Sequence, residues 1–150
     1  MNHMKNLLRI TIVLCFLLML GGCGNKMTAH TVESVKDYLV SKDYYSDDIR
    51  GYSLGGVSDI GGLINHSWLF AFYDYGDNKD ALDDIIPVFL ADDQDTYDVT
   101  RKSNYVIYEK ETQNGYILYV RVDNTLLLIS GPGKDKEEIR SIARDLGYYR

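Results

Sequence analysis

Apolar residues recur along this chain with two different spacings, which together predict a domain of helices and strands. Residues 31–42, 79–92 and 135–146 carry apolar side chains three to four positions apart, a spacing typical of amphipathic helices. Residues 67–75 and 105–130 instead hold runs rich in Tyr, Val, Ile, Leu and Phe, as strands do. Helices segregated from a mainly antiparallel sheet predict an α+β fold, with the three helices packed mostly on one face.

The strand patterns also predict how the sheet is ordered. Residues 67–75 are apolar on both faces, so we expect this strand near the centre of the sheet. Residues 105–130 predict a three-stranded antiparallel meander, because residues 112–115 and the Asp123-Asn124 pair are good hairpin signals. The five glycines of residues 51–62 indicate a turn-rich link between short strands.

Capping residues and one proline bear on the helix boundaries. Thr31 is placed to cap the first helix, and Asp135 with Glu138 forms a capping-box pattern at the third. Pro87 lies inside the second helical pattern, where it removes a backbone donor. The second helix therefore either kinks at Pro87 or ends just before it, and we favour the kink.

The N-terminus follows a separate pattern. Lys5 and Arg9 precede an uncharged apolar run at residues 10–20, and Gly21, Gly22 and Cys23 come next. Such a run has the length of a signal-peptide core, about 7–15 residues, and is too short to span a bilayer, which takes about 20. A basic start, a short apolar run and small residues in this order predict a secretory signal peptide.

The stretch Leu20-Gly21-Gly22-Cys23 resembles the lipobox of bacterial lipoproteins. The resemblance implies cleavage between Gly22 and Cys23 and attachment of a diacylglycerol unit to the Cys23 sulfur. Leu20 and Gly22 match the residues that the family prefers, whereas Ala, Ser, Thr or Val is commoner at the position of Gly21. The protein is therefore expected on the extracytoplasmic face of a cell membrane, with the membrane itself as a partner through the lipid anchor.

These patterns divide the chain into three parts. Residues 1–22 are the signal peptide, residues 23–30 a lipidated N-terminus with a short tether, and residues 31–150 one globular domain. Cys15 leaves with the signal peptide and Cys23 carries lipid, so no thiol, disulfide or cysteine metal site is expected in the mature domain. Export without disulfides is common in Gram-positive proteins, so we expect a Gram-positive source. We expect no cofactor.

The charge of the chain bears on its partners. The full sequence has 16 basic and 22 acidic residues, and loss of Lys5 and Arg9 leaves 14 against 22, a net charge of −8. Residues 74–98 alone hold nine aspartates and one lysine. Nucleic acids and anionic lipid headgroups bind cationic surfaces, so this composition excludes direct binding of DNA or RNA.

The acidic segment contains weak candidates for a metal site. Asp74, Asp77 and Asp80 could offer oxygen ligands to calcium, but the spacing lacks the pattern of an EF-hand loop. The simpler interpretation is that Asp80 caps the second helix, and this interpretation is favoured over a metal site. No metal ion is therefore assigned.

Tyrosine is frequent, with 13 residues in the chain, and four of them concentrate in the meander. Exposed tyrosines are common at recognition surfaces, so Tyr105, Tyr108, Tyr116 and Tyr119 are candidates for a contact surface. Cross-strand aromatic packing explains the same residues without a partner, and the composition favours that interpretation.

No catalytic constellation is visible in the sequence. No Gly-x-Ser-x-Gly elbow or phosphate-binding loop is present, and no pair of carboxylates is singled out. We therefore expect a non-enzymatic binding or interaction domain at the membrane. Two alternatives stay open: an inhibitor or immunity-type lipoprotein that captures a basic protein, and an envelope hydrolase or its accessory domain.

Overall fold

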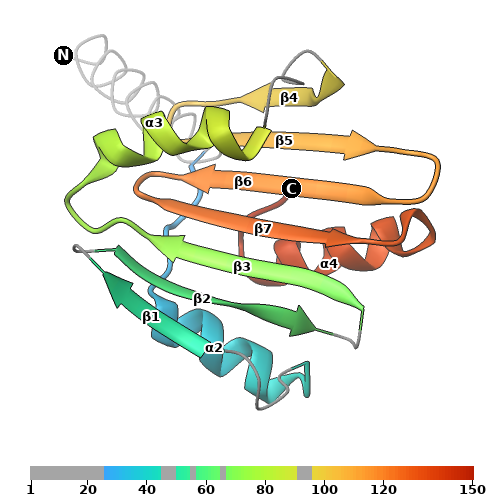
Figure 1. The fold of residues 1–150 in the computed structure, drawn as a ribbon, viewed down its shortest axis with the longest axis horizontal. Coiled ribbons are helices and arrows are strands. Elements are labelled where there is room, and N and C mark those ends of the chain that lie inside the picture. Colours follow the sequence, from blue (N-terminus) through green and yellow to red (C-terminus); the bar gives the residue numbers. More distant parts are fainter. Residues whose placement is uncertain (1–25, 45–49, 55–56, 65–66, 91–95) are drawn as a thin grey trace, which may run out of the picture.

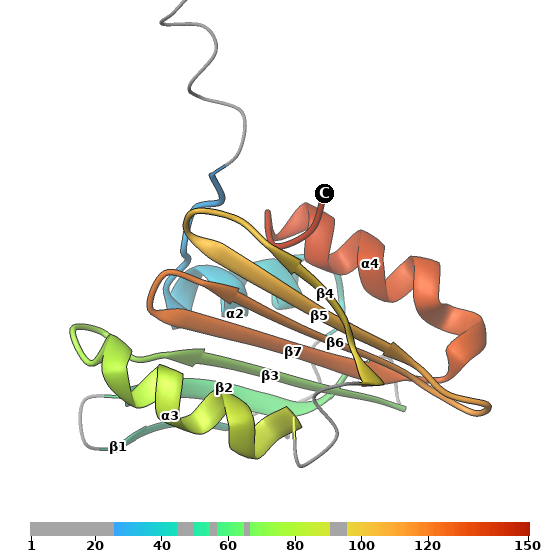
Figure 2. The ribbon, with the colours of Figure 1, turned by 90° about the horizontal axis from the view of Figure 1, so that it is seen from above.

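Helices cover both faces of one antiparallel sheet in the computed structural model of the chain, which describes residues 26–44, 50–54, 57–64, 67–90 and 96–150 (Figures 1 and 2). The predicted α+β class is confirmed. The signal segment and Cys23 lie outside the described residues. Within those ranges, no helix combines the length and the apolar character needed to cross a membrane.

The elements follow the predicted order. They are α2 (Val32–Ser41), β1 (Arg50–Leu54), β2 (Val57–Ile64), β3 (Trp68–Asp74), α3 (Lys79–Leu90), β4 (Asp98–Arg101), β5 (Tyr105–Glu111), β6 (Tyr116–Val122), β7 (Thr125–Gly131), a short 3₁₀ turn (Gly133–Asp135) and α4 (Lys136–Asp145). Residues 105–130 thus form the predicted meander, joined by turns at residues 112–115 and at Asp123-Asn124.

In the part of the chain that the structure describes, seven strands form the sheet, in the order β1-β2-β3-β7-β6-β5-β4. Strand β3 pairs with β2 on one side and with β7 on the other, which confirms the central place predicted for residues 67–75. The prediction of a turn-rich link at residues 51–62 needs correction. Gly51, Gly61 and Gly62 lie inside paired strands. A Cβ atom at Gly61 would come 3.4 Å from the carbonyl oxygen of Phe70, an ordinary van der Waals distance, so the pairing of β2 with β3 does not itself require glycine there.

The two faces of the sheet have separate cores. Helices α2 and α4 cover one face and α3 packs on the opposite one (Figure 2). On the α2/α4 face, Trp68, Phe70 and Phe72 of β3 are all buried to 1% exposure or less. On the α3 face, Leu82, Ile86 and Leu90 pack against Ala71, Tyr108, Tyr119, Leu126 and Leu128. Two of the three helices therefore share a face, and α3 does not join them.

Helix α3 continues through Pro87 to Leu90, so the alternative in which it ends before the proline is wrong. Pro87 itself is exposed, whereas Leu90 is 2% exposed. Packing of Leu90 on the sheet thus holds the last turn in place despite the lost backbone donor.

Helix ends differ partly from the predicted caps. The Thr31 hydroxyl accepts a hydrogen bond from the Ser34 amide, as predicted. The capping box predicted at Asp135 does not form. The Asp135 carboxylate makes no hydrogen bond to the helix and instead accepts one from the Trp68 indole, at 3.0 Å. A buried indole N–H needs an acceptor, and Asp135 supplies it.

Helix α4 ends in a Schellman motif at Gly147. Gly147 has φ of +74°, a conformation that favours glycine, and the Tyr148 amide donates to the Ala143 carbonyl at 2.7 Å. The reversal buries the Tyr148 ring against Phe72 in an edge-to-face contact at 5.8 Å. The last residues of the chain are thereby fastened to the sheet.

Candidate functional site

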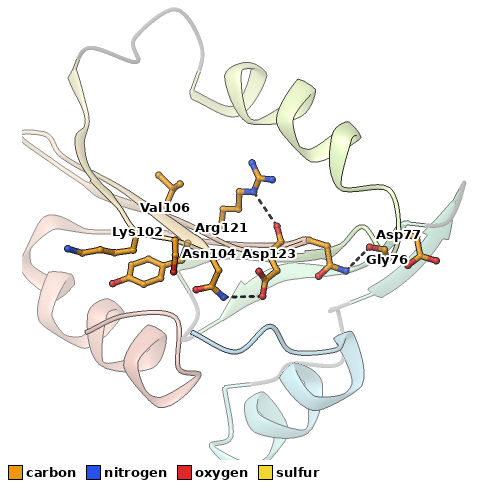
Figure 3. A pocket seen from close by; sticks show the side chains of 10 residues that line it. Gly76, Asp77, Lys102, Asn104, Val106, Arg121 and Asp123 are labelled. Atoms are coloured by element: carbon orange, nitrogen blue, oxygen red, sulfur yellow. Dashed lines mark hydrogen bonds between the residues drawn. The ribbon is translucent and has the colours of Figure 1, made fainter. Parts of the chain in front are cut away.

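A pocket of about 580 Å³ lies where three turns meet at one end of the sheet (Figure 3). Lys102, Ser103 and Asn104 come from the turn between β4 and β5, and Asp123 and Asn124 form the turn between β6 and β7. Gly76 and Asp77, from the turn between β3 and α3, and Arg121 of β6 complete its polar wall.

Most polar groups of this pocket bind one another. The Asn104 amide donates to the Asp123 carboxylate at 3.1 Å, and the Arg121 guanidinium donates to the Asp123 carbonyl at 3.2 Å. Arg121 also forms an ion pair with Asp83 of α3. These contacts fix the turns relative to α3 and leave few donors directed at a ligand.

The turn between β3 and α3 is held in the same way. The Asn124 amide donates to the Gly76 carbonyl at 2.7 Å and to the Asp74 carboxylate at 3.3 Å. Asp74 also accepts from the Gly76 amide at 2.9 Å, which closes a local turn. Asp74 is therefore engaged in turn geometry.

Lys102 and Asp77 are the charged side chains at the rim of this pocket that have no hydrogen bond or ion pair within the described part of the chain. Both are exposed. One cation and one anion on opposite turns suit a zwitterionic or polar ligand, or a protein surface, better than a single strongly charged group.

A second polar cluster fastens α4 to β5. The Glu109 carboxylate accepts hydrogen bonds from the Arg140 guanidinium at 2.8 and 2.9 Å, and further bonds from the Tyr116 and Tyr149 hydroxyls. Partial burial alone would raise the pKa of Glu109, but the bonds from Tyr116 and Arg140 outweigh it and the pKa is lowered. The contacts of this cluster are internal, so its role is to hold the C-terminal helix.

The four tyrosines proposed as a contact surface are buried, which corrects that expectation. Their exposed fractions are 6% for Tyr105, 7% for Tyr108, 1% for Tyr116 and 9% for Tyr119. They also divide between the two faces, because Tyr105 and Tyr116 join the α2/α4 core while Tyr108 and Tyr119 lie under α3. Burial raises the pKa of Tyr119 to about 12, with Tyr97 adding to the shift.

The three aspartates considered as metal ligands do not form a cluster. Asp80 lies in the first turn of α3, one residue after its start, so it is not the cap. Across the residues that the structure describes, no group of three or more His, Cys, Asp or Glu side chains is arranged to hold a metal ion. Cys23 lies outside the described residues.

Sequence reasoning missed Asn104, Lys102 and Arg121. The predicted meander could have indicated that these residues are neighbours. In an antiparallel pair, the start of β5 and the end of β6 lie at the same end of the sheet. The turn residues 102–104 and 123–124 were therefore neighbours by topology, although they are about twenty positions apart in the chain.

Comparisons with known proteins support the fold alone. No protein-family model matches the chain, and no curated protein matches it. Among solved structures, a GTP-binding regulator from Thermotoga maritima is similar, with a TM-score of 0.51 and 14% identity, over 84% of this chain and 94% of that protein. At this identity the likeness extends to the arrangement of helices and strands and not to the site.

Proposed function

We propose that this protein is a lipid-anchored lipoprotein of a bacterial envelope, whose domain is a non-enzymatic binding module at the outer face of the cytoplasmic membrane. The lipid anchor rests on Leu20-Gly21-Gly22-Cys23. The binding role rests on one observation: the exposed side chains of Lys102 and Asp77 lie at the rim of a pocket whose other polar groups mostly hold its turns together.

That observation favours binding because a catalytic site needs several groups that converge on a substrate, whereas the side chains that converge in this pocket are bonded to one another. Asp123 accepts from Asn104, and Arg121 is shared between Asp123 and Asp83. The pocket wall is thus a polar surface whose side chains bond one another. Lys102 and Asp77 make no side-chain hydrogen bond or ion pair within the described ranges and are left at the rim for recognition. No specific contact among the described residues favours the hydrolase alternative.

Replacement of Cys23 tests the lipid anchor. In cells grown with labelled palmitate, Cys23→Ser is expected to give an uncleaved precursor without label, because the serine hydroxyl cannot form the thioether. Cys15→Ser is the matched control, since Cys15 lies in the segment that is removed, and it is expected to be labelled and processed normally. Normal labelling of Cys23→Ser would contradict the proposal.

A specific observation favours capture of a basic protein as a second candidate. Asp77, Asp80, Asp83 and Asp84, here called the acidic surface, are all exposed on α3 and the turn before it. Within the described residues the one ion pair among them joins Asp83, 58% exposed, to Arg121. A concentrated negative surface steers and holds cationic partners.

Variant proteins of equal charge test this candidate. Asp80→Asn with Asp84→Asn removes two charges from the acidic surface, and Glu33→Gln with Asp37→Asn removes two exposed charges from α2. Capture of one basic protein from intact cells should weaken with salt and be lost in the α3 variant alone. Equal capture by both variants would remove this candidate.

A further inference from the structure

The segment expected to be a tether is part of the folded domain. Met27 is 4% exposed and belongs to the α2/α4 core. Its backbone is held at both polar groups by one side chain: the Met27 amide donates to the Asn104 carbonyl oxygen at 3.2 Å, and the Asn104 amide donates to the Met27 carbonyl at 2.8 Å. This pairing copies a strand–strand contact and fixes the direction in which the chain enters the domain.

The end of the chain holds the same segment through further contacts. The Tyr148 hydroxyl accepts from the His30 amide at 3.1 Å, and the Arg150 guanidinium donates to the Lys26 carbonyl. The His30 and Tyr148 rings lie 5.9 Å apart. Residues 26–30 are therefore bound along their length, from the first described residue onward.

This docking shortens the link to the lipid. Only Gly24 and Asn25 separate Cys23 from Lys26 in the sequence. At no more than about 3.6 Å per residue, the Cα atom of Lys26 lies within about 11 Å of that of Cys23, against roughly 25 Å for a free tether that runs to His30. A lipid-bearing cysteine sits at the headgroup level, so the surface around Lys26 must lie at or next to the headgroups.

The surface around Lys26 has a charge that suits this position. A hollow there is lined by Lys26, His30, Arg144 and Arg150, with Asp145 as its acidic member. Its cations are Lys26, Arg144 and Arg150, of which Arg144 also pairs with the exposed Glu137 at 3.7 Å, so the hollow is locally basic on a domain that is acidic overall. Figure 2 shows residues 26–30 and the C-terminal end on the side of the sheet away from α3, which carries the acidic surface.

We propose that the docked segment 26–30 holds the domain in one orientation on the membrane, with the Lys26–Arg144–Arg150 surface against anionic phospholipid headgroups and the acidic surface of α3 directed away. The inference rests on the proposed lipid anchor at Cys23. It assigns opposite tasks to two sides of the domain: one meets lipid, and the other is presented to soluble partners.

Quenching of a site-specific fluorophore in lipid vesicles tests this orientation. The mature chain has no free thiol once Cys23 is lipidated, so Thr28→Cys and Val88→Cys each supply a single labelling site. Thr28 is an exposed residue of the docked segment, and Val88 is 69% exposed on α3. The full lipidated protein is inserted into preformed phosphatidylglycerol–phosphatidylcholine vesicles that carry a nitroxide on the headgroup.

The fluorophore at position 28 is expected to be quenched at least about threefold more than the one at position 88. A domain of about 125 residues has a radius of gyration of roughly 14 Å, which places the far side beyond the range of contact quenching. Equal quenching at the two positions, or stronger quenching at position 88, would overturn the proposal.

A spacer variant shows whether the docked segment is the cause. Twelve Gly/Ser residues inserted between Gly24 and Asn25 add roughly 20 Å of mean reach without altering the domain. The contrast between the two positions is expected to disappear, and its persistence would show that the short link does not set the orientation. Asn104→Ala, which removes both bonds to Met27, is expected to reduce the contrast partly, after its fold has been checked by circular dichroism.

The controls separate this inference from the proposed function. Incorporation of labelled palmitate and flotation with vesicles report the anchor by themselves. Protein that is labelled and floats but shows equal quenching refutes the orientation alone, whereas protein that lacks label refutes the anchor and the orientation together.

Discussion

The two faces of the sheet differ in how completely they are covered. On the α2/α4 face, Trp68, Phe70 and Phe72 are closed off by two helices and by Tyr148. On the opposite face, the described residues include a single helix of 12 residues, which covers only part of the sheet, and Leu63 and Leu69 stay 56% and 49% exposed. Burial drives stability, so we expect the α2/α4 face to contribute more to it, and the partly covered α3 face is the one on which we propose recognition.

Neighbouring residues of β3 give the sharpest test of this contrast. Phe70→Ala removes a fully buried ring from the α2/α4 core and is expected to lower the free energy of unfolding by about 3–5 kcal/mol. Leu69→Ala, on the α3 face, is expected to cost less than about 1 kcal/mol because the side chain is half exposed. Urea unfolding of the mature chain measures both, and equal losses would end the division of roles between the faces.

The polar cluster around Glu109 is expected to stabilise the α2/α4 face. Glu109→Gln is expected to cost about 2 kcal/mol at pH 7, because a carboxylate that accepts from Arg140 and two tyrosines is replaced by a neutral amide. Since the pKa of Glu109 is lowered in the folded state, its contribution is complete above the unfolded value of 4.5 and is lost as the pH falls through the folded value.

The stability gap between wild type and Glu109→Gln should therefore be largest near neutral pH and narrow below pH 4.5. Urea midpoints at several pH values measure it. Glu137→Gln is the matched control, because Glu137 also pairs with Arg140 but is 74% exposed, and it is expected to have little effect. A gap that stays constant with pH would show that the charge of Glu109 contributes nothing.

The third prediction concerns the end of the chain. Tyr148→Phe keeps the buried ring but removes the hydroxyl that contacts Thr125 at 2.6 Å and accepts from the His30 amide. The expected loss is about 1–2 kcal/mol, with faster amide hydrogen exchange at His30. Unchanged exchange at His30 would show that the C-terminal residues do not hold the entering segment.

The sequence could predict elements but not which faces they cover. The apolar spacing of residues 79–92 shows that this helix has a buried side, and either face of the sheet satisfies that pattern. The alternation of β6 likewise predicts one half-exposed face. In the structure Phe89 of α3 covers Tyr119 on that face, with ring centres 6.2 Å apart, and the spacing of residues in β6 carries no information about this contact. The buried tyrosines follow from that packing.

The pocket and the docked segment were harder still to foresee. Asn104 and Met27 are 77 positions apart, and an asparagine in a turn is ordinarily explained by its local backbone preferences. Asp135 is a similar case: its carboxylate accepts a hydrogen bond from the Trp68 indole, 67 positions away, and does not cap the helix as expected. In each case a long-range polar partner displaced the local role that the sequence favoured.

The smallest change in stability is expected on the α3 face, where the Asp83–Arg121 ion pair contrasts with the Glu109–Arg140 pair on the other face. Asp83 pairs with Arg121, but Asp83 is 58% exposed, whereas Glu109 and Arg140 are 17% and 22% exposed. An exposed ion pair gains little Coulomb energy in water, so Asp83→Asn is expected to change the free energy of unfolding by less than about 0.5 kcal/mol. Chemical unfolding with and without 0.5 M salt measures it, and a loss comparable to that of Glu109→Gln would mean that α3 is structural. A small change in stability together with weaker capture of a basic partner would instead assign Asp83 to recognition, as the partial cover of this face predicts.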